Sequence, residues 1–101
     1  MTTSTTEIRL ADAVGVHVTD ELLTVELSDG RSVSVPTAWF PRLANATSAE
    51  RDNWRFIGTG QGIHWSDLDE DLSVEGILAG RSSGESQRSL SRWLEQRRGA
   101  A

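Results

Sequence analysis

The chain has 101 residues, no cysteine and no apolar run long enough to span a membrane. We therefore expect one small domain without disulfides or thiolate zinc sites. The formal charge of −5 argues against non-specific binding to nucleic acid, which depends on neutralising phosphates.

Charge and composition divide the chain into three parts. Residues 1–10 are expected to form a flexible N-terminal tail, which lacks the features of a signal peptide, so we expect a cytoplasmic protein without membrane contact. Residues 11–80 are expected to form a single α+β domain. A polar linker and a basic amphipathic helix are expected over residues 81–101. Residues 1–80 carry thirteen acids and five arginines, a formal −8, whereas residues 81–101 carry five arginines and two glutamates, a formal +3.

Alternating apolar residues predict three strands at the start of the domain. Their inward-facing residues are expected to be Val14, Val16 and Val18, then Leu23, Val25 and Leu27, then Val33 and Val35. Asp29-Gly30 is typical of a two-residue hairpin turn, because glycine tolerates the positive φ that such a turn requires. The first third of the chain is therefore predicted to be an antiparallel meander.

Short helices and a second hairpin are predicted next. A helical segment is expected around Trp39 to Ala44, with Pro41 near its start. Thr47 and Glu50 have the spacing of a capping box, which predicts a helix over about Ser48 to Asn53. The apolar and aromatic residues on either side of the sequence G-T-G-Q-G, at 58–62, predict two paired strands.

Two further helices are predicted in the last third. Leu68, Leu72, Val74, Ile77 and Leu78 are spaced roughly as on a helix, which Asp71 or Ser73 could cap and Gly80 could end. Ser89 to Arg98 is predicted to form the basic amphipathic helix. Together these elements predict an α+β fold with a small antiparallel sheet of about five strands, a meander plus a hairpin. Short helices are expected mainly on one face, with the C-terminal helix as an appendage.

Several motifs resemble one bacterial family of small proteins of unknown function, DUF2442. The motifs are Asp29-Gly30, W-F-P-R-L at 39–43, A-T-x-x-E-R-x-x-W at 46–54 and I-H-W-x-x-L-D-E-D-L-S-V-E-G at 63–76. The resemblance implies a small α+β protein that is encoded beside another small protein, an arrangement similar to toxin–antitoxin pairs. Because the family has no established catalytic residues, none is transferred to this chain.

The acidic stretch around residues 64–71 is the densest group of chemically versatile side chains. Asp67, Asp69 and Asp71 begin like a calcium-binding EF-hand loop, but Leu72 and Leu78 stand where that loop needs glycine and glutamate. The acids could instead cap a helix N-terminus, and His64 could be a structural histidine. We interpret the stretch and its neighbours as a binding surface for a basic partner: Trp39, Arg42, His64, Trp65, Asp67, Asp69, Glu70 and Asp71. Trp39 and Arg42 could form an exposed aromatic–cation pair within it.

The basic tail is expected to dock on the acidic body, either its own or that of a second subunit in a homodimer. The residues expected to make this contact are Arg88, Arg92, Trp93 and Arg97.

The sequence favours a non-enzymatic protein-interaction module, the acidic, antitoxin-like member of a two-protein bacterial system with a small basic partner encoded nearby. We assign no catalytic residue, metal ligand or cofactor. Two alternatives stay open. One is a metal-dependent hydrolase that uses His64 and the carboxylates of Asp67 to Asp71. The other is a DNA-linked regulator that acts through the arginine-rich C-terminal helix.

Overall fold

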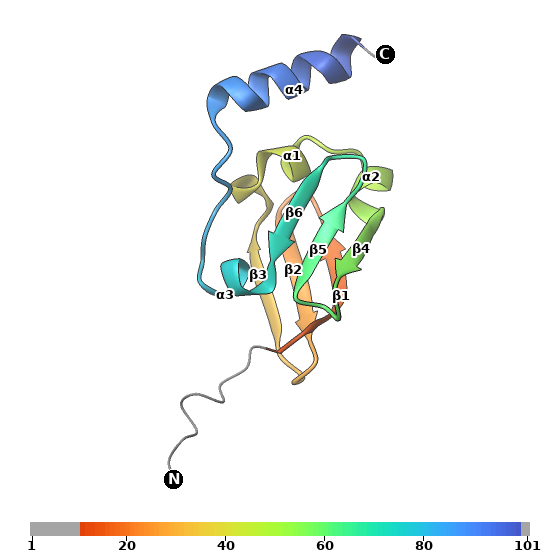
Figure 1. Ribbon diagram of the computed structural model, residues 1–101, viewed down its shortest axis with the longest axis vertical. Helices are drawn as coiled ribbons and strands as arrows, with labels where there is room; N and C mark the ends of the chain where they lie inside the picture. Colours follow the sequence, from red (N-terminus) through yellow and green to blue (C-terminus); the bar gives the residue numbers. More distant parts are fainter. Residues whose placement is uncertain (1–10, 100–101) are drawn as a thin grey trace.

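Six strands form two separate three-stranded antiparallel sheets in the computed structural model, which describes residues 11–99. The first sheet has the order β1-β2-β3, and the second has the order β4-β5-β6 (Figure 1). The strands are β1 (Ala13–Val18), β2 (Leu22–Leu27), β3 (Ser32–Pro36), β4 (Trp54–Ile57), β5 (Gly62–Trp65) and β6 (Glu70–Ser73). The α+β class is confirmed, but a single sheet of about five strands is not. The predicted tail, residues 1–10, lies outside the described residues.

Short helical segments connect and follow the sheets. A 3-10 turn, η2 (Thr37–Trp39), leads into α1 (Pro41–Ala44) and α2 (Ser48–Asp52), which lie between the two sheets in the chain. Pro41 opens α1, and both hydrogen bonds of the predicted capping box between Thr47 and Glu50 are present in α2. The last helices are α3 (Val74–Leu78) and α4 (Gln87–Gly99). None of the helices described is long and apolar enough to cross a membrane.

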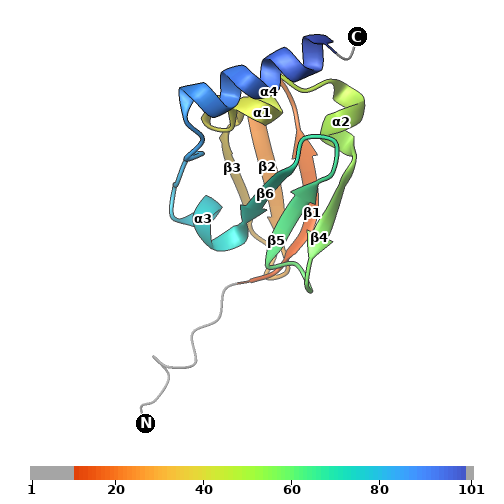
Figure 2. The ribbon, with the colours of Figure 1, turned by 45° about the horizontal axis from the view of Figure 1, so that its top comes forward.

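The hydrophobic core joins the two sheets. Leu23, Val25 and Leu27 of β2 form one cluster with Ile63 and Trp65 of β5, and each of these side chains is at most 3% exposed. The inner face of the first sheet is therefore covered by the second sheet, and not mainly by helices as the sequence predicted (Figures 1 and 2). The hairpin of the second sheet also touches the start of β1, since the N–H of Ala13 donates to the carbonyl of Gly60 at 2.8 Å.

A β-bulge changes the predicted face of one residue. The pairing of β1 with β2 shifts between Ala13 and Gly15, so that Val14 is 56% exposed. Val16 and Val18 keep their inward orientation opposite Val25 and Leu23. The strict alternation expected for the first strand therefore fails at Val14, because the bulge inserts an extra residue that no period-two pattern can reveal.

The predicted helix over Leu68 to Leu78 is replaced by a turn, a strand and a shorter helix. Leu68 is buried within the turn, and residues 70–73 pair with β5 as strand β6. The hydroxyl of Ser73 accepts a hydrogen bond from the N–H of Gly76 and so caps α3, as one of the two predicted alternatives. The apolar spacing indicated a helix, but aspartate is a weak helix former, and in β6 Leu72 pairs with the buried Ile63 of β5.

Helix α4 lies across one end of the molecule, beyond α1 (Figures 1 and 2). The connecting residues 81–86 form neither helix nor strand. None of the residues of α4 is fully buried. The helix is therefore an appendage that rests on the body through a few side chains.

Candidate protein-interaction site

The turn between β5 and β6 exposes two of the predicted acids. The N–H of Leu68 donates to the carbonyl of Trp65, and the N–H of Asp69 donates to that of Ser66. Leu68 is fully buried and anchors the turn, whereas Asp67 and Asp69 are exposed. Asp69 has a φ of 51°, a left-handed conformation that aspartate tolerates better than most residues. The turn therefore holds its carboxylates at the surface on a buried anchor.

Strand β6 sends its acids to opposite faces. Asp71 lies opposite His64 on the outer face, and a ring nitrogen of His64 forms a hydrogen bond with the Asp71 carboxylate. Glu70 lies opposite Trp65 and therefore on the inner face. The acidic stretch is thus split between two surfaces instead of forming one patch at a helix N-terminus.

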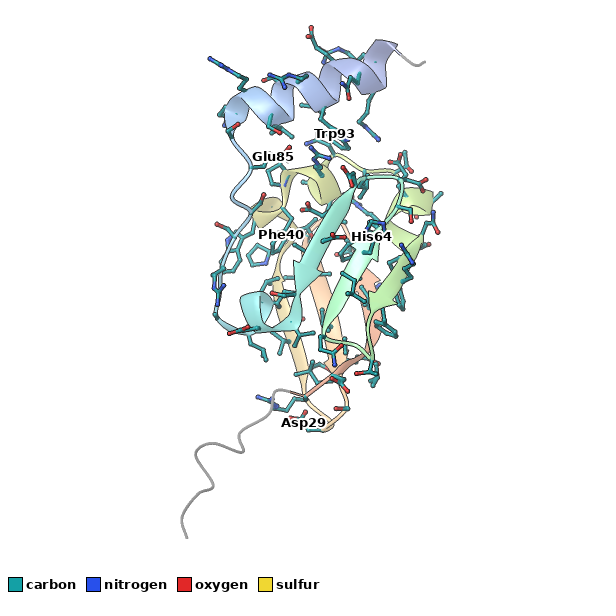
Figure 3. All side chains as sticks on the ribbon, in the orientation of Figure 1. Asp29, Phe40, His64, Glu85 and Trp93 are labelled. Carbon is teal, nitrogen blue, oxygen red and sulfur yellow. The ribbon has the colours of Figure 1, made fainter. Side chains whose placement is uncertain are left out.

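A groove of about 480 Å³ runs along β6 on the side away from β5. Its other sides are α3 and residues 81–86, and the apolar side chains of Phe40, Leu72 and Ile77 contribute to its lining. Figure 3 shows Phe40 between β6, α3 and the segment that leads to α4. Four carboxylates and two arginines complete the charged part of the lining: Asp69, Glu70, Asp71, Glu85, Arg42 and Arg81.

Glu70 is the charged residue with the most unusual environment in this groove. Burial raises the pKa of its carboxyl to about 7, Arg42 opposes the rise, and the nearby carboxylates of Glu85, Asp71 and Asp69 add to it. Glu70 takes part in none of the ion pairs found among residues 11–99. It is therefore a half-buried carboxyl group that faces the groove without a cationic partner.

Arg42 is committed to internal contacts. Its Nε lies 3.0 Å from both carboxylate oxygens of Glu85, its Nη2 donates to the same carboxylate at 2.7 Å, and its Nη1 donates to the carbonyl of Leu68 at 2.8 Å. The Glu85 carboxylate raises the pKa of Arg42, and Arg42 in turn lowers the pKa of Glu85. Arg42 therefore fastens the linker and the acidic turn to α1.

The aromatic residues of the predicted surface lie in different environments. The prediction that Trp65 belongs to the binding surface is wrong, because its side chain is fully buried and its indole N–H donates to the carbonyl of Arg51. Trp39 is 37% exposed, and its carbonyl accepts the N–H of Ser83. Arg42 was expected to pair with the ring of Trp39. Its guanidinium instead lies over the ring of Trp93, 5.1 Å from the ring centroid.

In this single chain α4 contacts its own body. Arg97 donates two hydrogen bonds to the Glu50 carboxylate, at 2.8 and 3.0 Å, and its guanidinium lies 4.6 Å from the Trp93 ring centroid. Trp93 points from α4 toward the body (Figure 3). Arg88 and Arg92 are exposed, and Arg92 lines a second groove of about 420 Å³ between α4 and the acidic turn.

Two residues that sequence reasoning did not single out organise this end of the molecule. Arg51 is 8% exposed and donates to the carbonyls of Leu43 and Ala44 and to the carboxylate of Asp20. Glu85 is the partner of Arg42. An arginine inside a short helix and a glutamate inside a polar linker give no periodic signal, although the motif at 46–54 contains Arg51.

The geometry offers no ligand set for a metal within the part of the chain that the structure describes. No group of three or more histidine, aspartate or glutamate side chains there is arranged to hold an ion. His64 pairs with Asp71, whereas Asp67 accepts a hydrogen bond from Asn53. The metal-dependent alternative thus receives no support from the positions of its own proposed residues.

The fold and site define a small α+β protein with two facing antiparallel sheets, an acidic strand edge and an accessory basic helix. The profile of a family described as "Protein of unknown function (DUF2442)" matches residues 13–83, and the chain belongs to that family. None of the curated proteins compared with the chain matches it.

Two solved structures share this fold. One is a protein of unknown function from Rhodospirillum rubrum, with a TM-score of 0.67 and 25% identity, and the match covers 78% of this chain and 98% of that one. The other is an uncharacterised protein from Chromobacterium violaceum, with a TM-score of 0.61 and 19% identity, and the match covers 80% of this chain and 74% of that one.

Proposed function

We propose that this protein is a non-enzymatic interaction module whose acidic body binds a basic partner protein. The proposal rests on which of the charged side chains beside β6 form ion pairs and which do not. Three of the four arginines within residues 11–80, Arg31, Arg42 and Arg51, are each paired with a carboxylate of this chain, and the fourth, Arg55, lies on β4 opposite His64. Asp69 and Glu70 form no ion pair among residues 11–99. At this strand edge the Asp69 carboxylate therefore has no ion-pair partner, and Glu70, whose pKa is raised to about 7, places a further ionisable carboxyl beside it. Such a site attracts a positively charged surface.

The rigid mounting of this edge supports binding as its role. Ile63 and Trp65 on β5 and Leu68 in the turn are completely buried, so the acids stand on a fixed base. Pre-organised groups lose little conformational entropy when a partner binds, which favours a specific contact. The finer proposal is that the partner is a small basic protein encoded beside this one, and that this protein is the acidic, antitoxin-like member of the pair.

Co-expression with the product of the adjacent reading frame tests the proposal. We expect the two proteins to elute together in gel filtration at micromolar concentration, and we expect this protein to relieve any toxicity of its neighbour. The double variant Asp67→Asn/Asp69→Asn should weaken the complex and make it less sensitive to salt. The double variant Glu21→Gln/Glu26→Gln is the matched control, because it removes the same charge from exposed positions in β2 and in the turn before it.

The proposal is wrong if the proteins elute separately and neither changes the other's effect on growth. Equal weakening by both double variants would mean that only the total charge matters. In that case the acidic strand edge would not be the binding site.

A further inference from the structure

Strand β6 has an open edge, and that edge faces the groove. Among residues 11–99, β6 is the last strand of its sheet and pairs only with β5. The N–H of Val74 donates to the carbonyl of Gln61, which continues the same antiparallel register. Because hydrogen-bonded and non-hydrogen-bonded pairs alternate, residues 70 and 72 bond to β5 and the N–H and C=O of Asp71 point away from it. A backbone donor and acceptor are thus presented to the groove.

The opposite side of the groove is held in place by specific contacts. The N–H of Ser83 donates to the carbonyl of Trp39 at 2.9 Å, and Glu85 is bound by Arg42 two residues further on. Residues 81–86 therefore form the side of the groove opposite β6. Phe40 and Ile77 also line the groove. Its volume of about 480 Å³ lies within the range of about 300–1,000 Å³ that is usual for ligand pockets.

The charges in the groove indicate which side chain would complete it. Glu70 lies on the inner face of β6, beside Leu72, with no cation bound to it among the described residues. The guanidinium of Arg42 is nearby but is already bound to Glu85. Asp69 and Asp71 lie at the rim. A cationic side chain that reached Glu70 would make a charge-assisted hydrogen bond in a partly desolvated place, where such bonds are strong.

We propose that this groove binds an extended segment of a partner polypeptide, which adds as a further strand to β6 and places an arginine or lysine side chain against Glu70. An unpaired strand edge is complementary to another extended backbone, and alternate side chains of the added strand then enter the groove. This inference rests on the proposed function, since it specifies how a basic partner is held. It goes further by assigning the contact to backbone pairing and to one carboxyl group.

A titration of the full-length, isotopically labelled protein followed by NMR tests this mode of binding. The ligand is a capped hexapeptide of alternating threonine and valine with one central arginine. We expect the amide signals of Asp71 and Ser73 to shift, and we expect hydrogen exchange at Asp71 to slow about tenfold at saturation. Replacing the arginine with citrulline, or Glu70 with glutamine, should weaken binding about tenfold, because a charged hydrogen bond is lost.

Two controls separate the contributions of charge and backbone. A peptide that is N-methylated at the amide facing the carbonyl of Asp71 keeps its charge but cannot pair, and it should bind at least tenfold more weakly. The Glu21→Gln variant changes the charge by the same amount as Glu70→Gln but at an exposed position in the turn between β1 and β2, outside this groove, and it should bind the arginine peptide nearly as the natural protein does. Unchanged dispersion of the spectrum shows that each variant is folded.

Three results would overturn the inference. The first is the absence of any shift at Asp71 up to about 1 mM peptide. The second is a response confined to Asp67 and Asp69 that depends on charge but not on N-methylation, which would leave the proposed acidic binding surface intact. The third is a change at Asp71 on dilution without peptide, which would show that a second copy of the chain occupies the edge.

Discussion

Arg97 of α4 and Glu50 of α2 are joined by two hydrogen bonds, although they are 47 residues apart in the chain. The same carboxylate also accepts the backbone N–H of Thr47 at 2.8 Å and completes the cap of α2. One side chain therefore both starts a helix of the body and holds the accessory helix against it.

Replacing Glu50 with glutamine should loosen α4 while leaving the body folded. Glutamine can still complete a capping box, but it cannot form an ion pair with Arg97. For a partly buried pair with two hydrogen bonds we expect a loss of about 1 kcal/mol, which corresponds to roughly fivefold faster trypsin cleavage within α4. The control is Glu75→Gln in the first turn of α3, which should leave the cleavage rate unchanged.

Docking of α4 should also weaken at acidic pH. Hydrogen bonds from Arg97 lower the pKa of Glu50 from 4.5 to about 2. The stabilisation from this ionised carboxylate is therefore complete above about pH 4.5 and is lost as the pH falls toward 2. Hydrogen exchange in α4, measured between pH 5 and pH 2.5 and corrected for the intrinsic rate, should show this loss. The Glu50→Gln variant should show no such transition, and an identical transition in the variant would assign it to another group.

Arg51 should be the arginine whose loss destabilises the body most. Arg51→Met removes hydrogen bonds to the carbonyls of Leu43 and Ala44 and the ion pair with Asp20, so we expect a loss of about 2–4 kcal/mol. Arg31→Met is the matched control, because Arg31 also pairs with an aspartate but is largely exposed, and it should cost less than about 1 kcal/mol. Urea unfolding measures both, and similar losses would contradict the structural role of Arg51.

The sequence was sufficient for elements that local signals specify. The capping box at Thr47 and the inward faces of β2 and β3 depend on neighbouring residues alone. A hairpin also forms at Asp29-Gly30, but the predicted two-residue turn is wrong: Leu27 bonds to Arg31, so the loop has three residues, 28–30, and of Asp29 and Gly30 only Gly30 has a positive φ. It was insufficient where partners lie far apart in the chain. Strand β6 exists because β5 has an open edge, and the partner of Arg42 is 43 residues away. The binding surface was located by composition, but its division into a groove and an outer face follows from the strand that replaced the helix.

Residues 1–83 should fold without α4. The family profile ends at residue 83, the Rhodospirillum rubrum protein is covered almost fully by 78% of this chain, and no residue of α4 is fully buried. Truncation removes Trp93 and two ion pairs, those of Glu85 and Glu50, so we expect a loss of about 1–3 kcal/mol with the cooperative transition retained. Urea unfolding of both lengths tests this. A truncated chain with a collapsed NMR spectrum would show that α4 is part of the folding unit.

The stability of the body should fall as the pH rises through neutrality, because of Glu70. Its pKa of about 7 in the folded protein lies above the value of 4.5 expected in the unfolded chain. The unfolded state therefore releases this proton first, and the stabilising contribution is complete below about pH 4.5 and is lost as the pH rises through 7.

The charged groups that act on Glu70 are Arg42, Glu85, Asp71 and Asp69. Burial outweighs the opposing charge of Arg42, and the three carboxylates add to the rise in the pKa of Glu70. The shift corresponds to at most about 3 kcal/mol, and solvent in the groove should reduce the observed loss between pH 5 and pH 8 to about 1–2 kcal/mol. Glu70→Gln should remove this loss and be more stable than the natural protein at pH 8. Asp69→Asn should retain most of it, since it changes a charge at the exposed rim. Urea unfolding at half-unit intervals of pH measures the three proteins, and parallel curves for the natural protein and Glu70→Gln would show that Glu70 does not titrate near neutrality.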